Sequence, residues 1–193
     1  MKRLKTININ TPEHYNDIFR GRHFKIHKGI SQVEIRADHL LRKFNGGKFL
    51  DIGCGLAVNS LRALEMGAEV YAIDFSDKLI EHLSKEFPEI NYSVQDARTL
   101  SYEDNYFDYI VMGEFLEHFD NPKEVISEAV RVLVSNGTLA VSVPLNDNGR
   151  YSEREHIWSF KEKDIRDLLS EFGEAETHII TGSKKYIIGY LKK

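Results

Sequence analysis

The most constraining feature of this chain is a short apolar run that turns on two glycines and passes directly into an amphipathic pattern. The segment KFLDIGCGLAV covers residues 48–58. The apolar run suits a buried strand, and the pattern after it suits a helix. Gly53 and Gly55 permit positive φ and let a ligand approach the main chain, while the helix start offers unpaired N–H groups. A tight strand-helix turn can also need glycine for packing alone, so the neighbouring segments must decide between these interpretations.

Length and composition favour one globular domain. The 193 residues are 41% apolar and 29% charged, which suffices for a sizeable core. The net charge of −4 disfavours nucleic acid and anionic membranes as general partners. Cys54 is the single cysteine and can form no internal disulfide, and no apolar run approaches the roughly 20 residues that span a bilayer. The N-terminal residues lack the apolar segment of a secretory signal, so a cytoplasmic location is expected.

Strand and helix patterns alternate along the chain. Alternation of this kind predicts an α/β fold in which helices cover both faces of a doubly wound parallel sheet. The segments Arg20–Ile30 and Leu145–Ser159 lack periodicity and are expected to be loops. The expected helices cover residues 12–19, 31–44, 57–66, 76–87, 122–134 and 160–172. The expected strands number seven and cover residues 48–52, 68–74, 90–94, 106–112, 138–143, 175–181 and 185–191.

Acidic side chains follow several of the expected strands. Ligands on such sheets bind beyond the carboxyl ends of the strands, where Asp74, Asp96 and Glu114 are expected beside the glycine turn. Asp74 follows that turn by about 20 residues, a spacing suited to holding both hydroxyls of a ribose. Phe75 offers an aromatic face to a purine, and Asp96 can accept from an exocyclic amine. Each acid, taken alone, can instead cap the next helix.

These motifs together resemble the class I S-adenosylmethionine-dependent methyltransferases over residues 48–191. The matching segments are FLDIGCG, AIDFS, QDA, FDYIVMGEFLEHFDNP and RVLVSNGTLAVSVP. The resemblance implies a Rossmann-like, mostly parallel sheet whose seventh strand is antiparallel. Together with the chain length, it predicts a single methyltransferase domain over residues 1–193, in which the helices expected at 1–46 form an arm or lid ahead of the Rossmann-like core at 47–193. One departure is Ala57, where many members have a third glycine.

The resemblance also assigns a cofactor and its contacts. S-adenosylmethionine would be held with Asp51, Gly53 and Gly55 at its methionine part and Asp74 at its ribose. The remaining expected contacts are Phe75, Asp96 and Ala97 around the adenine and Glu114 near the sulfonium. The rival nucleotide interpretation is a dinucleotide-dependent oxidoreductase, whose pyrophosphate needs Gly-x-Gly-x-x-Gly. Val58 stands at the third glycine position here, which favours the methyl donor.

The expected chemistry is transfer of a methyl group to an oxygen or nitrogen of a small molecule. The leaving group is already activated, so alignment supplies much of the acceleration, and a base is needed only for a protonated nucleophile. The candidate bases are His118, after the fourth strand, and His156, in the segment after the fifth. Both are expected to face the open end of the sheet. The sequence leaves the acceptor and the oligomeric state open.

A divalent metal is a further possibility that the sequence does not favour. If the segment after the fourth strand is helical, Glu114, Glu117 and His118 share a face and can bind a metal together with His156. This pattern resembles the metal set of the small-RNA 2′-O-methyltransferases, and its first part resembles the ubiquinone-pathway O-methyltransferases. Glu-His is also widespread among metal-independent members of the family. A metal-assisted RNA 2′-O-methyltransferase and a non-catalytic cofactor-binding protein therefore remain as alternatives.

Overall fold

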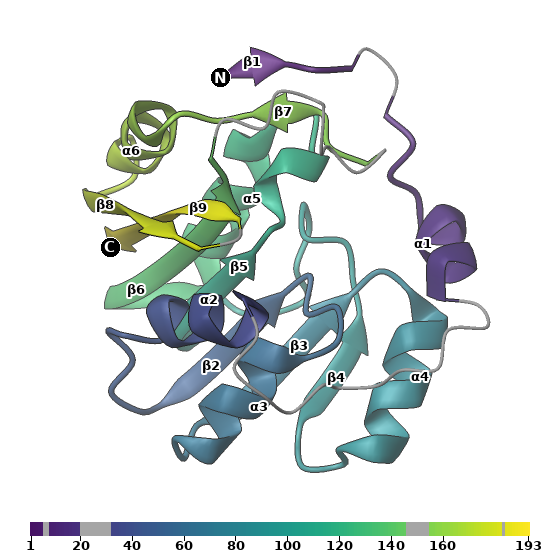
Figure 1. The fold of residues 1–193 in the computed structure, drawn as a ribbon. Helices are drawn as coiled ribbons and strands as arrows, with labels where there is room; N and C mark the ends of the chain where they lie inside the picture. The colour runs from purple at the N-terminus through teal and green to yellow at the C-terminus, as the bar shows by residue number, and fades with distance from the viewer. Residues whose placement is uncertain (6–7, 20–31, 146–154, 183) are drawn as a thin grey trace.

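The fold is organised around one large, mostly parallel sheet (Figure 1). The computed structural model describes residues 1–5, 8–19, 32–145, 155–182 and 184–193. The strands of the sheet follow the order β4-β3-β2-β5-β6-β9-β8. Their bounds are β2 Lys48–Ile52, β3 Glu69–Asp74, β4 Asn91–Val94, β5 Phe107–Gly113, β6 Leu133–Pro144, β8 Glu174–Thr181 and β9 Lys185–Lys192. Neighbours from β4 to β6 pair in parallel, whereas β9 is antiparallel to both β6 and β8. The predicted fold class is confirmed.

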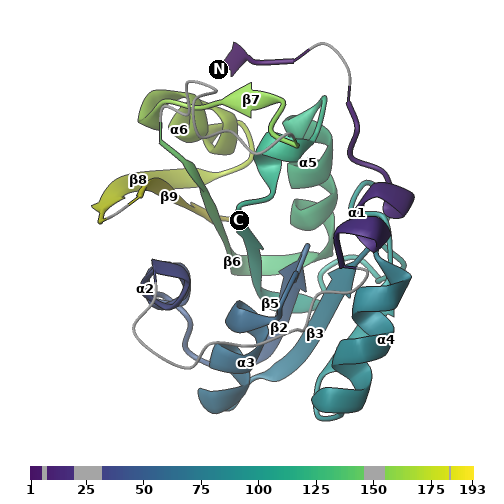
Figure 2. The same ribbon diagram turned by 45° about the vertical axis from the view of Figure 1, so that its right-hand side comes forward.

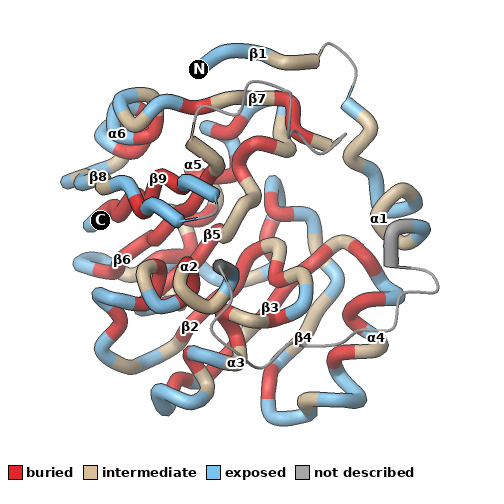
Figure 3. The backbone as a smooth tube through the Cα atoms, viewed as in Figure 1, coloured by how far each residue is buried: buried red, intermediate tan, exposed pale blue. Residues whose placement is uncertain are grey.

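Helices cover both faces of the sheet (Figure 2). One apolar layer joins the sheet to α2 Gln32–Leu40, α3 Val58–Glu65 and α4 Asp77–Glu86. The opposite layer joins it to α5 Pro122–Val132 and α6 Glu162–Ser170. Figure 3 shows the central strands as a buried band between these helices. No helix in the described ranges has the length and apolarity that crossing a bilayer would require.

The strand order places the ligand-binding end of the sheet beside β2. The chain moves from β2 outward to β3 and β4, then returns to the other side of β2 with β5. The reversal leaves a crevice beyond the carboxyl ends of β2 and β5, and this is the position where open α/β sheets bind ligands. The residues that follow β2, β3 and β5 therefore meet at one place.

The N-terminal segment crosses this end of the sheet. Its short strand β1, Lys2–Arg3, pairs antiparallel with β7, Trp158–Ser159, a pairing that the sequence did not predict. The guanidinium of Arg3 lies over the Trp158 ring and pairs with Asp120. Farther along the segment, helix α1, Pro12–Phe19, packs against α4 as Figure 1 shows. Two distant parts of the sequence are thereby tied together over the crevice.

Four expectations from the sequence need correction or lie outside the described residues. Strand β6 begins at Leu133 rather than Thr138, because Leu133 already pairs with Phe107. The segment after β5 is a short 3-10 helix, Leu116–His118, and not an α-helix that includes Glu114. The predicted loop Arg20–Ile30 lies outside the described residues, as does most of the predicted loop 145–159.

Candidate active site

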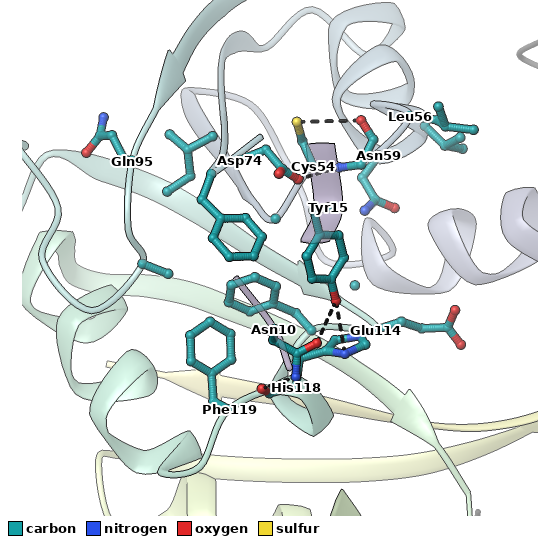
Figure 4. A pocket seen from close by; sticks show the side chains of 18 of the residues that line it. Asn10, Tyr15, Cys54, Leu56, Asn59, Asp74, Gln95, Glu114, His118 and Phe119 are labelled. Atoms are coloured by element: carbon teal, nitrogen blue, oxygen red, sulfur yellow. Dashed lines mark hydrogen bonds between the residues drawn. The ribbon is translucent and has the colours of Figure 1, made fainter. Parts of the chain in front are cut away.

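A cavity of about 500 Å³ lies at the carboxyl ends of β2, β3 and β5 (Figure 4). Its size falls in the usual range for small-molecule sites. It is lined by main chain from the glycine turn, by side chains that follow β3, β4 and β5, and by side chains of the N-terminal arm and α2. Of the predicted site residues, those that line it are Gly53, Gly55, Asp74, Phe75, Asp96, Ala97, Glu114 and His118.

The glycine turn is held open by its backbone geometry. Gly53, Gly55 and Ala57 have φ values of 69°, 49° and 58°, respectively. Ala57, the predicted departure from a third glycine, thus takes the left-handed conformation that glycine adopts more easily. The amides of Gly53 and Cys54 both donate to the Ile73 carbonyl at 2.9 Å. The start of the turn is thereby fixed to the end of β3.

Asp51 supports the turn from behind and does not line the cavity. Its carboxylate is fully buried and accepts hydrogen bonds from the Ser60 amide at 3.1 Å and the Ser60 hydroxyl at 2.7 Å. The Asn59 amide group donates to the other oxygen at 3.4 Å. Burial raises the pKa of Asp51 to about 6, although the hydrogen bonds from Ser60 and Asn59 lower it. Asp51 therefore fixes the start of α3 relative to β2.

Asp74 presents a buried carboxylate to the cavity. Its side chain is 8% exposed and accepts from the Gly55 amide at 3.3 Å and the Ser76 amide at 3.0 Å. Burial raises the pKa of Asp74 in spite of these hydrogen bonds. The ring of the next residue, Phe75, lies 4.9 Å from the ring of Tyr15. An aromatic pair and an acceptor carboxylate thus stand side by side.

Asp96 lies at the rim of the cavity beside Ala97. Arg98 binds its carboxylate through Nε and a terminal nitrogen, and these hydrogen bonds lower the pKa of Asp96. Residue 98 also lines the cavity. A ligand amine that reaches Asp96 therefore meets a carboxylate that is already charged and oriented by Arg98.

Glu114 pairs with a cation and does not join the metal-ligand set considered from the sequence. Its φ of 52° takes it out of helical register, which makes the assumption of a shared helical face wrong. The carboxylate pairs instead with Arg36 of α2 at 2.8 Å. The Arg36 guanidinium lies over the Tyr186 ring at 5.4 Å, is only 8% exposed, and leaves Nε without a hydrogen-bond partner among the described residues. Opposite charges therefore stand together in the cavity wall.

His118 is reached by two side chains of the N-terminal arm (Figure 4). The Tyr15 hydroxyl lies 3.3 Å from His118 Nδ1 and donates to Asn10 Oδ1 at 3.1 Å. The amide nitrogen of Asn10 donates to the carbonyls of His118 and Glu155, each at 2.9 Å. Burial, followed by the neighbouring His156, lowers the pKa of His118 to about 4. The imidazole is therefore neutral at neutral pH.

His156 lies behind His118 and does not line the cavity. The two rings meet edge to face with centroids 5.1 Å apart. The expectation that both histidines face the cavity therefore holds for His118 alone. One ligand atom each from Glu117, His118 and His156 can be chosen so that all three lie within 4.8 Å of one another. This donor set, with two imidazoles and a carboxylate, is compatible with a divalent transition metal.

Three residues of the cavity wall were not predicted from the sequence, namely Arg36, Asn10 and Tyr15. For Arg36 a signal existed, because Val33 and Leu40 at helical spacing put this cation on the partly apolar face of its helix. No comparable signal marks Asn10 and Tyr15. Their role depends on where the arm crosses the sheet, more than 100 positions away from His118.

The geometry agrees with what comparison with known proteins finds. Residues 50–141 match the family model described as a methyltransferase domain. Residues 50–141 are therefore similar to a methyltransferase domain, which is consistent with the class I family. Members of that family use S-adenosylmethionine, which is the cofactor that the resemblance of the sequence motifs implied.

Two curated relatives and one solved structure place the domain among known proteins. The demethylmenaquinone methyltransferase of Renibacterium salmoninarum is 30% identical over 97 residues, which are 50% of this chain and 41% of the relative. The ubiquinone biosynthesis O-methyltransferase of Coxiella burnetii is 33% identical over 117 residues, which are 58% of this chain and 50% of the relative. The chain thus spans about half the length of these relatives. The PH0226 protein of Pyrococcus horikoshii shares the fold, with a TM-score of 0.67, 24% identity, and coverage of 85% of this chain and 93% of that one.

The two glycines of the methyltransferase turn predict different responses to alanine. A Cβ at Gly53 would lie 2.2 Å from the Phe115 ring, whereas a Cβ at Gly55 meets no protein atom within 4 Å. We expect Gly53→Ala to lower the free energy of unfolding by about 2–4 kcal/mol through clash and strain. Gly55→Ala should cost about 1–2 kcal/mol from its left-handed conformation alone. Urea unfolding measures both, and equal losses would contradict the packing of Phe115 on Gly53.

Proposed function

We propose that this protein transfers a methyl group from S-adenosylmethionine to an oxygen or nitrogen of a small molecule. The observation that carries the proposal is the arrangement of the cavity. Asp74 and Phe75 offer a ribose acceptor and an aromatic face on one side, and Arg36 and Glu114 offer opposite charges on another. Figure 4 shows Tyr15 extending between the Asp74 side and His118. These features match the nucleoside and amino-acid parts of one ligand.

The adenosine part is assigned to the residues that follow β3 and β4. In our proposal, the two carboxylate oxygens of Asp74 accept from the ribose hydroxyls, which charge-assisted hydrogen bonding favours. Phe75 and Ala97 contact the adenine faces, and Asp96 accepts from its amine. Gly53 and Gly55 leave room for the chain that links ribose to sulfur. Asp51 contributes indirectly, because it fixes the turn that carries these two glycines.

The amino-acid part is assigned to the charge pair. A methionine tail carries one carboxylate and one ammonium, and Arg36 and Glu114 offer one partner for each. Arg36 Nε, which has no hydrogen-bond partner within the described part of the chain, supports this assignment, because a buried guanidinium without full hydrogen bonding is costly unless a ligand supplies an acceptor. In this proposal, the ligand enters between Arg36 and Glu114 and replaces their ion pair with two others. Arg36 then pairs with the ligand carboxylate, and Glu114 pairs with the ligand ammonium.

The reaction is proposed to be a single in-line displacement. The bound donor supplies a methyl group on a positively charged sulfur. The acceptor oxygen or nitrogen forms the new bond to that methyl as the carbon-sulfur bond breaks, and the electron pair remains on sulfur. His118, neutral at pH 7, takes the proton that the acceptor loses, and Tyr15 orients the imidazole. His156 acts as a positioning residue behind His118.

The N-terminal arm, residues 1–46, is proposed to serve as a lid of the same domain. Three contacts of its described part support this role. Arg3 pairs with Asp120, Asn10 bridges two carbonyls beside the cavity, and Asn16 accepts from the Ser76 hydroxyl at 2.6 Å. Exclusion of water from a reacting sulfonium strengthens electrostatic interactions inside the site.

Release of S-adenosylhomocysteine tests the proposed activity. The relatives named for ubiquinone and menaquinone pathways suggest catechols and hydroquinones as first acceptors, followed by small amines. Turnover with one of these acceptors, unaffected by chelator, is the expected result. Cofactor binding without turnover on any acceptor would favour the non-catalytic alternative. Turnover that needs a divalent metal and is lost in Glu117→Gln would favour the metal-assisted alternative, with a small RNA as the further acceptor to test.

Arg36→Ala should separate the two ends of the cofactor site. We expect affinity for S-adenosylhomocysteine to fall about 100-fold, because a buried cation contact to the carboxylate is lost. Affinity for methylthioadenosine, which lacks the amino-acid part, should change less than about twofold. Lys85→Ala is the control, because Lys85 is an exposed cation of α4 whose salt bridge to Glu81 stays within that helix. Equal losses for both ligands in Arg36→Ala would contradict the assignment of the charge pair.

Tyr15→Phe should affect turnover more than binding. The substitution keeps the ring beside Phe75 and removes only the hydroxyl that reaches Asn10 and His118. We expect kcat to fall about tenfold through poorer alignment, with cofactor affinity nearly unchanged. Tyr102→Phe serves as the control, because its hydroxyl contacts Ser93 and lies outside the cavity lining. Wild-type kcat in Tyr15→Phe would remove the hydroxyl from the mechanism.

A further inference from the structure

A second pair of histidines joins α2 to the last hairpin of the sheet. His39 Nδ1 lies 3.1 Å from His178 Nε2, and the ring centroids are 5.3 Å apart. His39 belongs to the last turn of α2, and His178 lies in the middle of β8. Neither residue lines the cavity, and neither has a part in the chemistry proposed above.

The surroundings of the pair tie the same two elements together. The Tyr190 ring of β9 stacks on His178 at 5.9 Å, and its hydroxyl donates to the His39 carbonyl. The Tyr109 hydroxyl of β5 donates to the Leu40 carbonyl at 2.7 Å. The end of α2 is therefore anchored by side chains from β5, β8 and β9. The charged groups around the pair are Arg42, Lys43, Glu162 and Glu176.

Two imidazole nitrogens at this distance can share only one hydrogen. One nitrogen donates and the other accepts, so the contact is compatible with two neutral rings or with one protonated ring. A second proton would direct two N–H groups and two positive charges at each other. Arg42 and Lys43 add positive charge nearby, which disfavours a divalent cation between the rings and makes proton uptake costly. The contact is therefore sensitive to pH.

The position of Arg36 connects this contact to the cavity. Arg36 precedes His39 by three residues, so both lie on neighbouring turns of α2. Loosening the end of the helix would move the cation that pairs with Glu114. We propose that the His39–His178 pair is a proton-sensitive joint that docks α2 on β8 and thereby sets how firmly Arg36 holds the amino-acid end of the cofactor. The coupling to the cofactor rests on the function proposed above.

The direction of the pH effect follows from His178. Burial, His39 and Arg42 lower its pKa below the ordinary value, so the folded chain binds fewer protons at this site than the unfolded chain. The contribution of the unprotonated histidine contact to the free energy of unfolding is complete above about pH 6.5, the pKa of an unfolded histidine. This contribution is lost as the pH falls through the pKa of His178 in the folded protein. The docked form of α2 is accordingly favoured at neutral pH and weakened under acid conditions.

Calorimetric titration with S-adenosylhomocysteine between pH 7.5 and 5.5 tests the coupling. The test variant is His178→Gln, whose amide reaches the position of Nε2 but does not titrate. We expect the wild-type affinity to fall about fivefold more than that of the variant, a coupling of the size common between linked sites. Other groups near the site also titrate, namely Asp51, Asp74 and His118. Their effect on affinity is the same in both proteins, so it cancels when the two pH dependences are compared. His82→Gln, a partly exposed histidine of α4 that pairs with Glu86 and lies outside the cavity lining, should behave like wild type.

Imidazole nitrogen shifts in the ligand-free protein test the joint without the cofactor. We expect acidification that protonates His178 to shift the nitrogen signals of both rings of the pair, and the signals of His39 to respond differently in His178→Gln. Nitrogen signals of His39 that change with pH identically in wild type and His178→Gln would overturn the joint. Equal pH slopes for wild type and variant in the calorimetric experiment would overturn its coupling to Arg36. If the protein binds S-adenosylhomocysteine at no pH, both the proposed function and its coupling to the histidine pair fail. The nitrogen shifts then still show whether the histidine pair is a proton-sensitive joint.

Discussion

The site depends on one buried carboxylate at the end of the central strand. Asp51 accepts two hydrogen bonds from Ser60 and one from Asn59, which joins β2 to the first turn of α3. Between these anchored points, the chain has only a few residues in which to turn, and it does so with left-handed conformations at Gly53, Gly55 and Ala57. The turn exposes its main chain to the cavity because both of its ends are fixed. The carboxylate thus shapes a binding surface that it does not itself touch.

The rest of the cavity wall is built from charged groups whose partners lie on different elements. Asp74 is held by amides of the glycine turn and of α4, whereas Glu114 at the end of β5 meets Arg36 of α2. The helix α2 is in turn docked through Tyr109, Tyr190 and the two histidines. The position of the cation in the cavity therefore depends on contacts made at the far end of its helix. The arm completes the enclosure through Asn10 and Tyr15.

The limits of sequence interpretation follow from these same contacts. Gly53, Gly55 and Asp74 could be predicted, because parallel strands end at one edge and bring their following residues together. Asp51 was predicted as a cofactor contact, but its neighbours along the chain did not reveal that it faces α3 instead. Glu114 and His118 do not share a helical face, because Glu114 takes a left-handed conformation and the 3-10 helix begins only at Leu116. Tyr15 could not be predicted, since only the three-dimensional course of the arm brings it to His118.

The most direct test of the central claim is calorimetric titration with S-adenosylmethionine and S-adenosylhomocysteine. Wild-type protein and Asp74→Ala, each shown to be folded by circular dichroism, would be compared with Asp77→Ala, whose carboxylate lies in the first turn of α4 and outside the cavity lining. We expect micromolar binding by wild type and Asp77→Ala, and affinity at least about 30-fold weaker in Asp74→Ala, as the loss of charge-assisted hydrogen bonds to two hydroxyls requires. Absence of binding in folded wild-type protein, or full binding in Asp74→Ala, would contradict the account.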